Sequence, residues 1–579
     1  MGGSLPARLE DFREVWVMDT EYVAGIGERP IPVCIVAREL HTGVTHRHWM
    51  DQLQEMRSPT YGLGDDCLLV AYSCMGDLQV HIALGWELPA RVLDLHAEFR
   101  HWANGRSNIV RHGLLDALNV FGLSGMAATE KNATRDLIMG GGPWSPADRD
   151  LILRYCEADV EVTSALLVRM IDQIDLPRAL LRGQYLQSLA AVEWHGVPID
   201  REFHGRIVEH RDAIMAGLIH EVDADYGVYD NDRFSKKRFS EYLIRNAIPW
   251  PRSKSGQLIF ERNTFKEQAE IYSELGPLHS LLRSLSVLKK NKLAVGHDGR
   301  NRAYLAPFGS RTGRNQPSTS QSIFGLPSWW RGLIQPLPGH GLAYLDWDQQ
   351  EFGIAAALSG DQAMMDAYRS GDPYLAFAKQ ASAVPHDATK VSHPQERDRF
   401  KACVLAVQYG MGADSLGRRL QVSPAHADQL LRMHRRTYGQ FWSWSDAMLD
   451  TALYRGWIET VFGWRQLLQS NINERSVRNF PMQANGAEMM RIAVSMAVEA
   501  GIELCMPVHD ALLIHAPLDV LDDQIARLST IMEDASGIVL GGFRLRSGQT
   551  IIRYPDRFVE KRGQAMWDLV QGILNDERR

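Results

Sequence analysis

Two aspartates and a row of basic residues in the C-terminal half of the sequence have the types and spacing that nucleotidyl transfer requires. Asp346 lies in LAYLDWDQQEF and Asp510 in MPVHDALLIH, and each follows an apolar run that is typical of a strand. Arg397, Lys401 and Tyr409 recur at multiples of four residues, which places them along one predicted helix. Carboxylates hold hard divalent cations, and fixed cations hold a triphosphate. The pattern predicts a metal-dependent site where the strands meet this helix.

A second acidic set lies near the N-terminus. Asp19 and Glu21 in VWVMDTE share one face of a predicted strand, because side chains alternate along a strand. Asp77 follows in AYSCMGD, and Tyr155 and Asp159 in YCEAD stand one turn apart on a predicted helix. Such carboxylates can hold a pair of metal ions, and a tyrosine beside them can orient an attacking water.

The elements that must position these residues fall into successive regions. Up to about residue 175, apolar strand-like runs alternate with helical stretches, as in an α/β domain. In this region Ser145, Pro146 and Asp148 predict the start of the helix that carries Tyr155 and Asp159. From about residue 178 to 300 the pattern is mainly helical, with basic residues that include Lys236 and Lys237. These lysines are candidates for contacts with a nucleic-acid backbone.

Length and composition limit the function class. A chain of 579 residues is too long for one core and indicates several domains. The net charge of −7 gives no general basic signature, so contact with nucleic acid must depend on local patches. The six cysteines are scattered without CxxC spacing, which favours reduced thiols in a cytoplasmic protein. Without a signal-like start or an 18-residue apolar run, we expect no association with a membrane.

The order of the first acidic set, DxE, then D, then YxxxD, resembles the proofreading 3′–5′ exonucleases of the DEDDy class. The resemblance implies that Asp19, Glu21, Asp77 and Asp159 bind two metal ions and that Tyr155 helps to position water at a single-stranded DNA 3′ end. One departure is Ser73, where this class usually has asparagine four residues before the third acid.

The remainder of the chain resembles the family A DNA polymerases, the group of bacterial DNA polymerase I. AAVEWHGVPID and the run into SRTGR are similar to the family's thumb, DWDQQE to its DYSQIE and VHDA to its VHDE. The resemblance implies that Asp346 and Asp510 ligate both catalytic metals and that Lys401 assists pyrophosphate departure. Glu351 would exclude a 2′-hydroxyl.

The same resemblance assigns further contacts. The nucleotide-binding residues would be Glu351, Arg397, Lys401, Leu405, Tyr409 and Tyr374. The DNA-binding residues would be Arg314, Arg475, Asn479, Gln483, His509, Lys236 and Lys237. Pro481 predicts that Gln483 begins a new helix.

Several positions depart from the polymerase pattern. Leu405 replaces an aromatic residue against the sugar, Tyr374 replaces a histidine that contacts the triphosphate, and Ala511 replaces the glutamate after the metal aspartate. Because both metal aspartates are present, we expect altered kinetics rather than lost activity. A chain that starts at the exonuclease, without a 5′ nuclease domain, resembles compact bacteriophage polymerases.

The predicted fold is α/β, with a ribonuclease H-like exonuclease domain at residues 1–175 followed by a right-hand polymerase. The predicted parts are a thumb at 176–305, a palm at 306–350 and 446–579, and fingers at 351–445. The predicted function is DNA-templated DNA polymerisation with 3′–5′ proofreading. It would use two Mg²⁺ ions per active site, with Mn²⁺ as a substitute, and the predicted partners are primer-template DNA and dNTPs. We expect a monomer in the cytoplasm of a bacterium or infected host, with no processivity factor identified.

Two other function classes stay open at this stage. The polymerase-like half could be a catalytically silent DNA-binding module that serves an exonuclease, or the chain could be a single-subunit RNA polymerase. Both metal aspartates argue against the first alternative, and Glu351 and the exonuclease-like region argue against the second. A further variant is the polymerase of a phage whose genome contains 2-aminoadenine.

Overall fold

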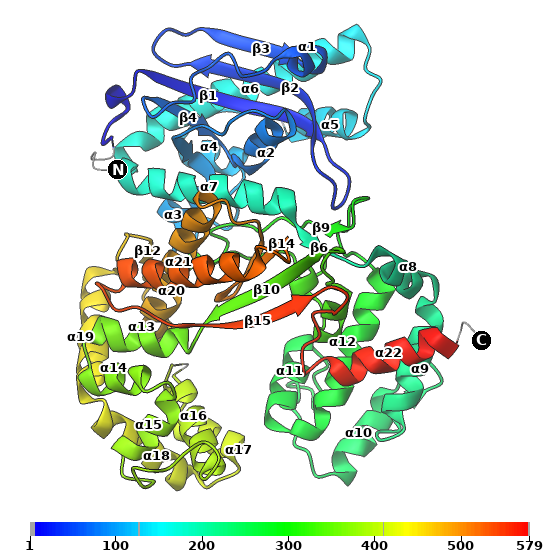
Figure 1. Ribbon diagram of the computed structural model, residues 1–579, viewed down its shortest axis with the longest axis vertical. Helices are drawn as coiled ribbons and strands as arrows, with labels where there is room; N and C mark the ends of the chain where they lie inside the picture. The colour runs from blue at the N-terminus through cyan, green and yellow to red at the C-terminus, as the bar shows by residue number, and fades with distance from the viewer. Residues whose placement is uncertain (1–5, 126–127, 409, 577–579) are drawn as a thin grey trace.

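The computed structural model describes residues 6–125, 128–408 and 410–576. Figure 1 shows an N-terminal unit at the top, a central sheet below it, and two mainly helical lobes on either side of that sheet. Within the described ranges, no helix is both long and apolar enough to cross a membrane. All six cysteines are buried and unbridged.

The N-terminal unit is built on a five-stranded sheet of order β3-β2-β1-β4-β5. Strand β1 pairs antiparallel with β2 and parallel with β4. The strands are β1 (Glu14–Val23), β2 (Ile31–Glu39), β3 (Thr45–Trp49), β4 (Cys67–Ala71) and β5 (Val92–Asp94). The helices are α1 (Met50–Glu55), α2 (Met75–Ala83), α3 (Leu95–Ala103), α4 (Leu114–Val120), α5 (Ala128–Met139) and α6 (Pro146–Met170).

The alternation along β1 separates two cores. Val15 and Val17 join the core that includes residues of α6, whereas Trp16 and Met18 join the core on the side of α7 (Leu176–His195). The same alternation places the side chains of Asp19 and Glu21 on the α6 side of the sheet. The start of α6 agrees with the sequence prediction, because Ser145 and Asp148 form a reciprocal capping box with Pro146 in the first turn.

Helix α7 connects the N-terminal unit to the rest of the chain. It packs against β5 on one side and against α20 (Glu474–Glu499) on the other. Gly183 is required for the first contact, since a Cβ at this position would lie 1.9 Å from the Val92 carbonyl oxygen. The glycine therefore lets α7 lie directly against the backbone of β5.

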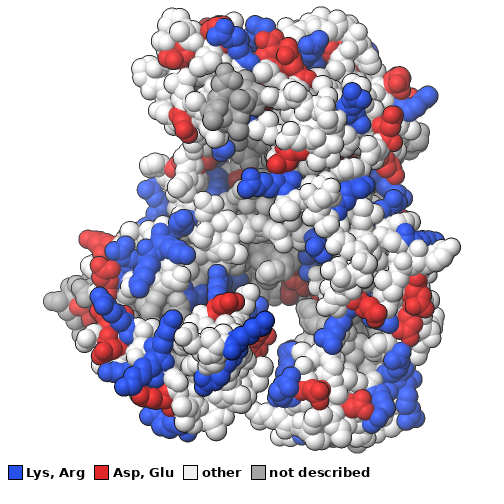
Figure 2. All heavy atoms as spheres, turned by 180° about the vertical axis from the view of Figure 1, so that it is seen from behind, with Lys and Arg blue, Asp and Glu red and all other residues white. Residues whose placement is uncertain are grey.

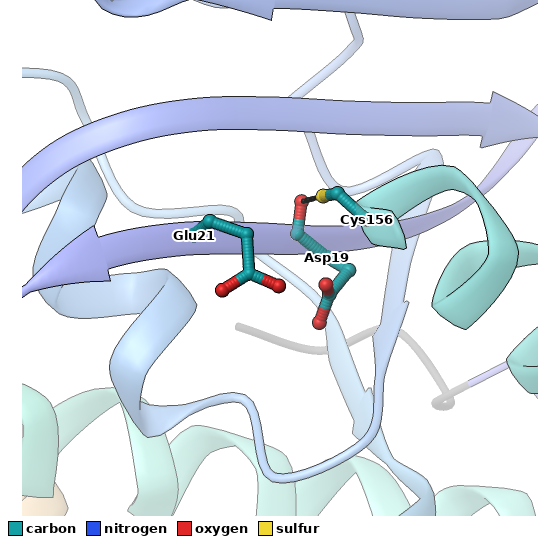
Figure 3. A group of neighbouring side chains, drawn as sticks. All are labelled: Asp19, Glu21 and Cys156. Atoms are coloured by element: carbon teal, nitrogen blue, oxygen red, sulfur yellow. Dashed lines mark hydrogen bonds between the residues drawn. The ribbon is translucent and has the colours of Figure 1, made fainter. Parts of the chain in front are cut away.

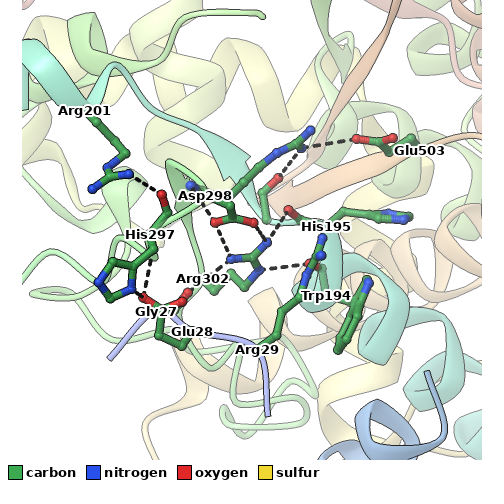
Figure 4. A network of polar contacts seen from close by, with 12 residues as sticks. Gly27, Glu28, Arg29, Trp194, His195, Arg201, His297, Asp298, Arg302 and Glu503 are labelled. Carbon is green, nitrogen blue, oxygen red and sulfur yellow. Dashed lines mark hydrogen bonds and ion pairs between the residues drawn. The ribbon is translucent and has the colours of Figure 1, made fainter. Parts of the chain in front are cut away.

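A network around Arg302 forms a second junction (Figure 4). The Arg302 guanidinium donates to the carbonyl of Gly27 in the β1–β2 loop at 3.2 Å and to that of Trp194 in α7 at 2.9 Å. It also pairs with Asp298, and Glu28 accepts from the backbone N–H of His297 at 2.8 Å. The loop after β1 is therefore fixed to the hairpin that precedes the central sheet.

One lobe, at the lower right of Figure 1, is almost entirely helical. It comprises α8 (Arg201–Glu209), α9 (Arg211–Asp223), α10 (Lys236–Arg245), α11 (Arg262–Ile271) and α12 (Gly276–Lys290). The last helix, α22 (Gln564–Asp576), packs against α9, and the Leu574 carbonyl accepts from Arg206 at 2.7 Å. The last described residues thus lie on this lobe. Short strand pairs complete it: β6 (Val197–Pro198) with β9 (Arg300–Asn301), and β7 (Tyr229–Asp230) with β8 (Arg233–Phe234).

The central sheet has four strands in the order β13-β14-β10-β15, all antiparallel to their neighbours. They are β10 (His340–Trp347), β13 (Leu504–Val508), β14 (Ala511–Pro517) and β15 (Ser547–Arg553). Helices α20 and α21 (Leu521–Val539) pack together and against the sheet.

The other lobe follows β10 directly. Its helices are α13 (Gln350–Ser359), α14 (Gln362–Arg369), α15 (Pro373–Gln380), α16 (Pro394–Gln408), α17 (Ala413–Leu420), α18 (Pro424–Thr437) and α19 (Gly439–Arg455). The hairpin of β11 (Trp457–Glu459) and β12 (Arg465–Leu467) then leads into α20. This lobe therefore carries predicted site residues that include Glu351 on α13, Tyr374 on α15, and Arg397 and Lys401 on α16.

Candidate active sites

The central sheet brings Asp346 and Asp510 together. Asp346 near the end of β10 is paired with Ala511 of β14, and Asp510 occupies the two-residue turn between β13 and β14. The Asp510 carbonyl accepts from the backbone N–H of Trp347 at 3.2 Å. Residues that are 164 positions apart by number thus become neighbours at one edge of the sheet.

The two carboxylates lie in a partly buried and mutually repulsive environment. Burial and the charges of Asp510 and Asp348 raise the pKa of Asp346. Burial also raises the pKa of Asp510, while Arg314 and His509 oppose that shift. Adjacent carboxylates that disfavour one another's charge fit a hard divalent cation, which removes the repulsion and prefers oxygen ligands.

Sequence reasoning missed two residues at this edge. Asp348 lies two positions after Asp346 and raises its pKa, a proximity that the period of two along a strand could have indicated. Gly548 on β15 pairs with Asp346, and a Cβ at this glycine would lie 3.2 Å from Asp348 Oδ1 and 3.3 Å from Asp346 Oδ1. The glycine therefore leaves space around both carboxylates, and no pattern in the sequence marks it.

Three other predicted residues surround the aspartate pair. Glu351 lies in the first turn of α13, where burial and the charge of Asp510 raise its pKa and Arg314 opposes the shift. The Arg314 side chain donates to the Gln483 carbonyl at 3.1 Å. His509, in the same turn as Asp510, is exposed with a left-handed φ of 56°. Glu351, Arg314 and His509 therefore belong to one site with the aspartates.

Helix α16 presents the predicted basic face. Arg397, Lys401 and Leu405 follow one another at four-residue steps, with Lys401 exposed and Leu405 half-buried. Both cations lie over the Tyr374 ring, at 5.6 Å for Arg397 and 5.8 Å for Lys401. Arg397 also pairs with Asp372, the N-cap of α15, at 2.5 Å. The predicted contact residue Tyr409 lies outside the described residues.

Tyr374 links this helix to the aspartate site. Burial raises its pKa, Arg397 opposes that shift, and the charges of Asp372 and Glu351 add to it. Tyr374 is therefore within electrostatic range of Arg397 on α16 and of Glu351 on α13.

Helix α20 carries Arg475, Asn479 and Gln483 on one partly open face, with Arg475 the most exposed of the three. The prediction that Gln483 begins a new helix is wrong, because α20 is continuous from Glu474 to Glu499 with Pro481 inside it. The Pro481 carbonyl accepts from the Asn485 side chain at 2.8 Å. The buried Asn479 Oδ1 has no hydrogen-bond partner within the described chain.

Lys236 and Lys237 lie apart from the aspartates, exposed at the start of α10. Lys236 stands over the Phe260 ring at 4.9 Å and lines a cavity of about 530 Å³, to which Arg262, Arg283 and Lys290 also contribute. In Figure 2, Lys and Arg side chains border the hollow between the two lower lobes. The negative net charge of the chain thus coexists with a basic surface on these lobes.

The N-terminal unit brings together all five members of the second predicted set. Asp19, Glu21, Asp77, Tyr155 and Asp159 line one cleft of about 730 Å³. Asp77 lies in the first turn of α2 and accepts from the Thr20 hydroxyl at 2.7 Å, while Tyr155 and Asp159 come from α6. Residues that alternate along β1 and residues spaced by four along α6 thus meet in one site.

The acidity of this cleft is strongly perturbed. Burial and the charges of its neighbours raise the pKa of Asp19 and of Glu21 well above their ordinary values. Burial raises the pKa of Asp77 to about 7. Burial and the Asp159 charge also raise the pKa of Tyr155. Four carboxylates in such a site fit divalent cations, which stabilise the ionised forms that burial disfavours.

Two further groups approach the cleft. Ligand atoms of Asp19, Glu21 and Cys156 lie within 4.8 Å of one another, but the Cys156 thiol donates to the Asp19 carbonyl at 3.2 Å rather than pointing to the carboxylates (Figure 3). Lys131 of α5 forms an ion pair with Asp159 at 2.7 Å. No spacing in the sequence linked Lys131 to the acidic set.

Comparison with known proteins gives consistent results. Residues 325–542 match the family model described as DNA polymerase family A. The sequence is 28% identical over 211 residues to the thermostable DNA polymerase I of Thermus thermophilus, across 34% of this chain and 25% of that protein. It is 25% identical over 400 residues to DNA polymerase I of Deinococcus radiodurans, across 63% of this chain and 40% of that protein. It is 24% identical over 418 residues to DNA polymerase I of Aquifex aeolicus, across 68% of this chain and 70% of that protein.

The chain thus spans a quarter of the Thermus relative's length and well under half of the Deinococcus relative's. A solved structure described as the POL domain of Pol1 from M. smegmatis in complex with DNA primer-template and dNTP has a TM-score of 0.70 and 18% identity. That similarity covers 93% of this chain and 95% of the other. It confirms the predicted fold class.

Proposed function

We propose that this chain is a DNA-templated DNA polymerase that adds dNTPs to a primer 3′ end, since residues 325–542 match the family model of DNA polymerase family A. The observation that carries the proposal is the arrangement around Asp346 and Asp510. The paired aspartates lie at one edge of the central sheet, and Arg397 and Lys401 of α16 lie over Tyr374. A pair of acids together with fixed cations suits a triphosphate with bound metal ions.

Asp346 and Asp510 would hold two Mg²⁺ ions, with Mn²⁺ as a substitute. Bound metal of this kind lowers the pKa of a hydroxyl and stabilises charge on phosphoryl oxygens. Arg397, which pairs with Asp372, would hold the triphosphate, and the exposed Lys401 would neutralise or protonate the departing pyrophosphate.

Selection of the sugar is assigned to Glu351, whose half-buried carboxylate lies within electrostatic range of Arg314 and Asp510. Leu405 offers an apolar surface in place of an aromatic ring. Tyr374, held beneath Arg397 and Lys401, contributes a neutral hydroxyl near the triphosphate.

Primer-template DNA is proposed to bind along α20 and the basic lobe. Arg314, His509 and the α20 residues Arg475, Asn479 and Gln483 would contact the primer terminus and template. Lys236 and Lys237 would neutralise phosphates of the upstream duplex without reading bases.

The N-terminal unit is proposed to be a 3′–5′ exonuclease that removes mismatched primer ends. Its support is the convergence of Asp19, Glu21, Asp77, Tyr155 and Asp159 on one cleft. The carboxylates would hold two divalent ions, and the Tyr155 hydroxyl would orient an attacking water.

The functional parts follow from these assignments. The exonuclease is proposed at residues 1–175, the thumb at 176–305, the palm at 306–350 and 446–579, and the fingers at 351–445. The contact of α22 with α9 joins the end of the palm segment to the thumb. The enzyme is proposed to act as a monomer.

One primer-extension assay, run in parallel with dNTPs and NTPs, tests the main proposal. Extension with dNTPs alone supports it. Extension with NTPs instead indicates an RNA polymerase, and trimming without extension indicates an exonuclease with a silent DNA-binding half.

The two sites are distinct, so their activities should separate. Asp19→Ala combined with Glu21→Ala should remove trimming of a mismatched 3′ end and preserve extension. Trimming at near the wild-type rate in this double variant would show that the cleft is not the exonuclease site.

A further inference from the structure

Lys131 forms an ion pair with Asp159, one of the carboxylates of the N-terminal cleft. Its ammonium donates to both oxygens of Asp159, at 2.9 and 2.7 Å. The lysine side chain is 23% exposed and that of Asp159 12%, so bulk water screens this pair only in part. The ammonium also lies 5.6 Å from the centre of the Tyr155 ring. Lys131 is therefore inside the proposed exonuclease site rather than on its rim.

Asp159 differs from Asp77 in the charge of its hydrogen-bond partner. Asp77 accepts from a neutral hydroxyl, that of Thr20, which brings no charge. The charge of Lys131 lowers the pKa of Asp19, whereas Asp77 and Asp159 raise it. Lys131 thus supplies positive charge to a set of carboxylates that repel one another.

A divalent ion and the lysine ammonium would oppose one another at the Asp159 oxygens. Two positive charges held this close repel one another strongly near a protein surface, where water screens them only in part. The ammonium also takes up one lone pair on each Asp159 oxygen, so a metal ion on the same carboxylate would lie close to it. Metal binding at this carboxylate therefore competes with the lysine ion pair.

We propose that Lys131 is a competing cation that holds Asp159 in the metal-free protein and sets the divalent-ion concentration at which the exonuclease site becomes loaded. The inference rests on the proposed exonuclease function. It assigns to α5, through Lys131, a positioning role at that site. Lys131 acts on the occupancy of Asp159 and is not assigned to the chemical step.

The test measures Mn²⁺ binding by electron paramagnetic resonance in a background of Asp346→Asn with Asp510→Asn, so that the signal reports the N-terminal cleft. Lys131→Met removes the charge at similar length, and Lys131→Arg keeps it. Lys254→Met, at an exposed lysine in a loop of the thumb-side lobe, is the matched control. Circular dichroism confirms that each variant is folded, and Lys131→Gln replaces Lys131→Met if the latter is not.

Lys131→Met should lower the Mn²⁺ concentration at half-saturation of the weaker site at least fivefold. Lys131→Arg and Lys254→Met should stay within twofold of the background. In EDTA, Lys131→Met should lower the Tm, because the carboxylates lose their internal cation. Saturating Mn²⁺ should abolish or reverse that difference, because the metal replaces the lysine.

An Mn²⁺ isotherm for Lys131→Met that is within twofold of the background, or weaker, overturns the proposal. So does a tenfold loss of trimming at saturating metal with an unshifted isotherm, since the lysine would then act on the substrate. The exonuclease assignment fails separately: protein with wild-type residues in the cleft would not trim a 3′ end at any Mn²⁺ concentration. The isotherms still decide the role of Lys131 in that case.

Discussion

Glu351→Ala should relax the selection of deoxyribonucleotides over ribonucleotides. Glu351 lies in the first turn of α13, within electrostatic range of Arg314 and Asp510, and burial raises the pKa of its carboxyl. A 2′-hydroxyl placed against this half-buried group collides with it and loses its hydrogen bonds to water. Leu405 provides no polar partner for that hydroxyl.

The expected change in sugar selectivity is estimated from the cost of burying the 2′-hydroxyl of the ribonucleotide. Leaving a buried hydroxyl without a partner costs about 1–3 kcal/mol. At about 1.4 kcal/mol for each factor of ten in rate, Glu351→Ala should reduce the preference for dCTP over CTP about 5- to 150-fold. Glu351→Gln keeps the volume of the side chain and should retain most of the preference.

The assay is steady-state incorporation of dCTP and CTP opposite guanine, expressed as the ratio of the two kcat/KM values. If that ratio changes by less than about threefold in Glu351→Ala, Glu351 does not exclude the ribose. The RNA polymerase alternative would then regain support.

Three further substitutions test other parts of the structure. Gly548→Ala should slow extension at least fivefold with little loss of DNA binding, because the new Cβ would lie 3.2–3.3 Å from the Asp348 and Asp346 carboxylates. The control is Gly572→Ala, where a Cβ meets nothing within 4 Å. Equal extension rates for the two variants would contradict crowding of the carboxylates by the new methyl group. Burial raises the pKa of Asp77 to about 7, so the folded metal-free protein retains a proton that the unfolded chain has lost. Its free energy of unfolding in EDTA should therefore fall as the pH rises from about 4 to about 7, and Asp77→Asn should flatten that slope in denaturant titrations; an unchanged slope would exclude Asp77 as its source. Arg302→Met should lower stability by about 2–5 kcal/mol, because Asp298 loses its partner and the carbonyls of Gly27 and Trp194 lose a donor; a Tm within 1 °C of the wild type would show that the junction adds little.

Local periodicity explains why much of both sites could be predicted from the sequence. Asp19 and Glu21 share a face because strands alternate, and Arg397, Lys401 and Leu405 share one because helices repeat near four residues. Local periodicity does not predict that Asp346 and Asp510 lie together, because their proximity depends on the pairing of β10 with β14. The family resemblance supplied that pairing, which spacing alone does not.

The remaining features depend on tertiary structure. Pro481 should disrupt a helix by local rules, yet α20 continues through it, packed against α21 and the sheet. Lys131 lies 28 positions from Asp159 in the sequence and meets it only because α5 crosses the cleft. Gly548 matters for the space that it leaves, which no side-chain motif records.

Single-turnover primer extension by Asp346→Asn and Asp510→Asn tests the central claim most directly. Asp366→Asn, an exposed acid on α14, is the control, and the affinity for primer-template is measured for each variant. If the paired aspartates hold the catalytic metal ions, both variants should lose at least 90% of the extension rate while the control and the DNA affinities change little. Retention of more than about a tenth of the wild-type rate in either variant would contradict the assignment of the polymerase site.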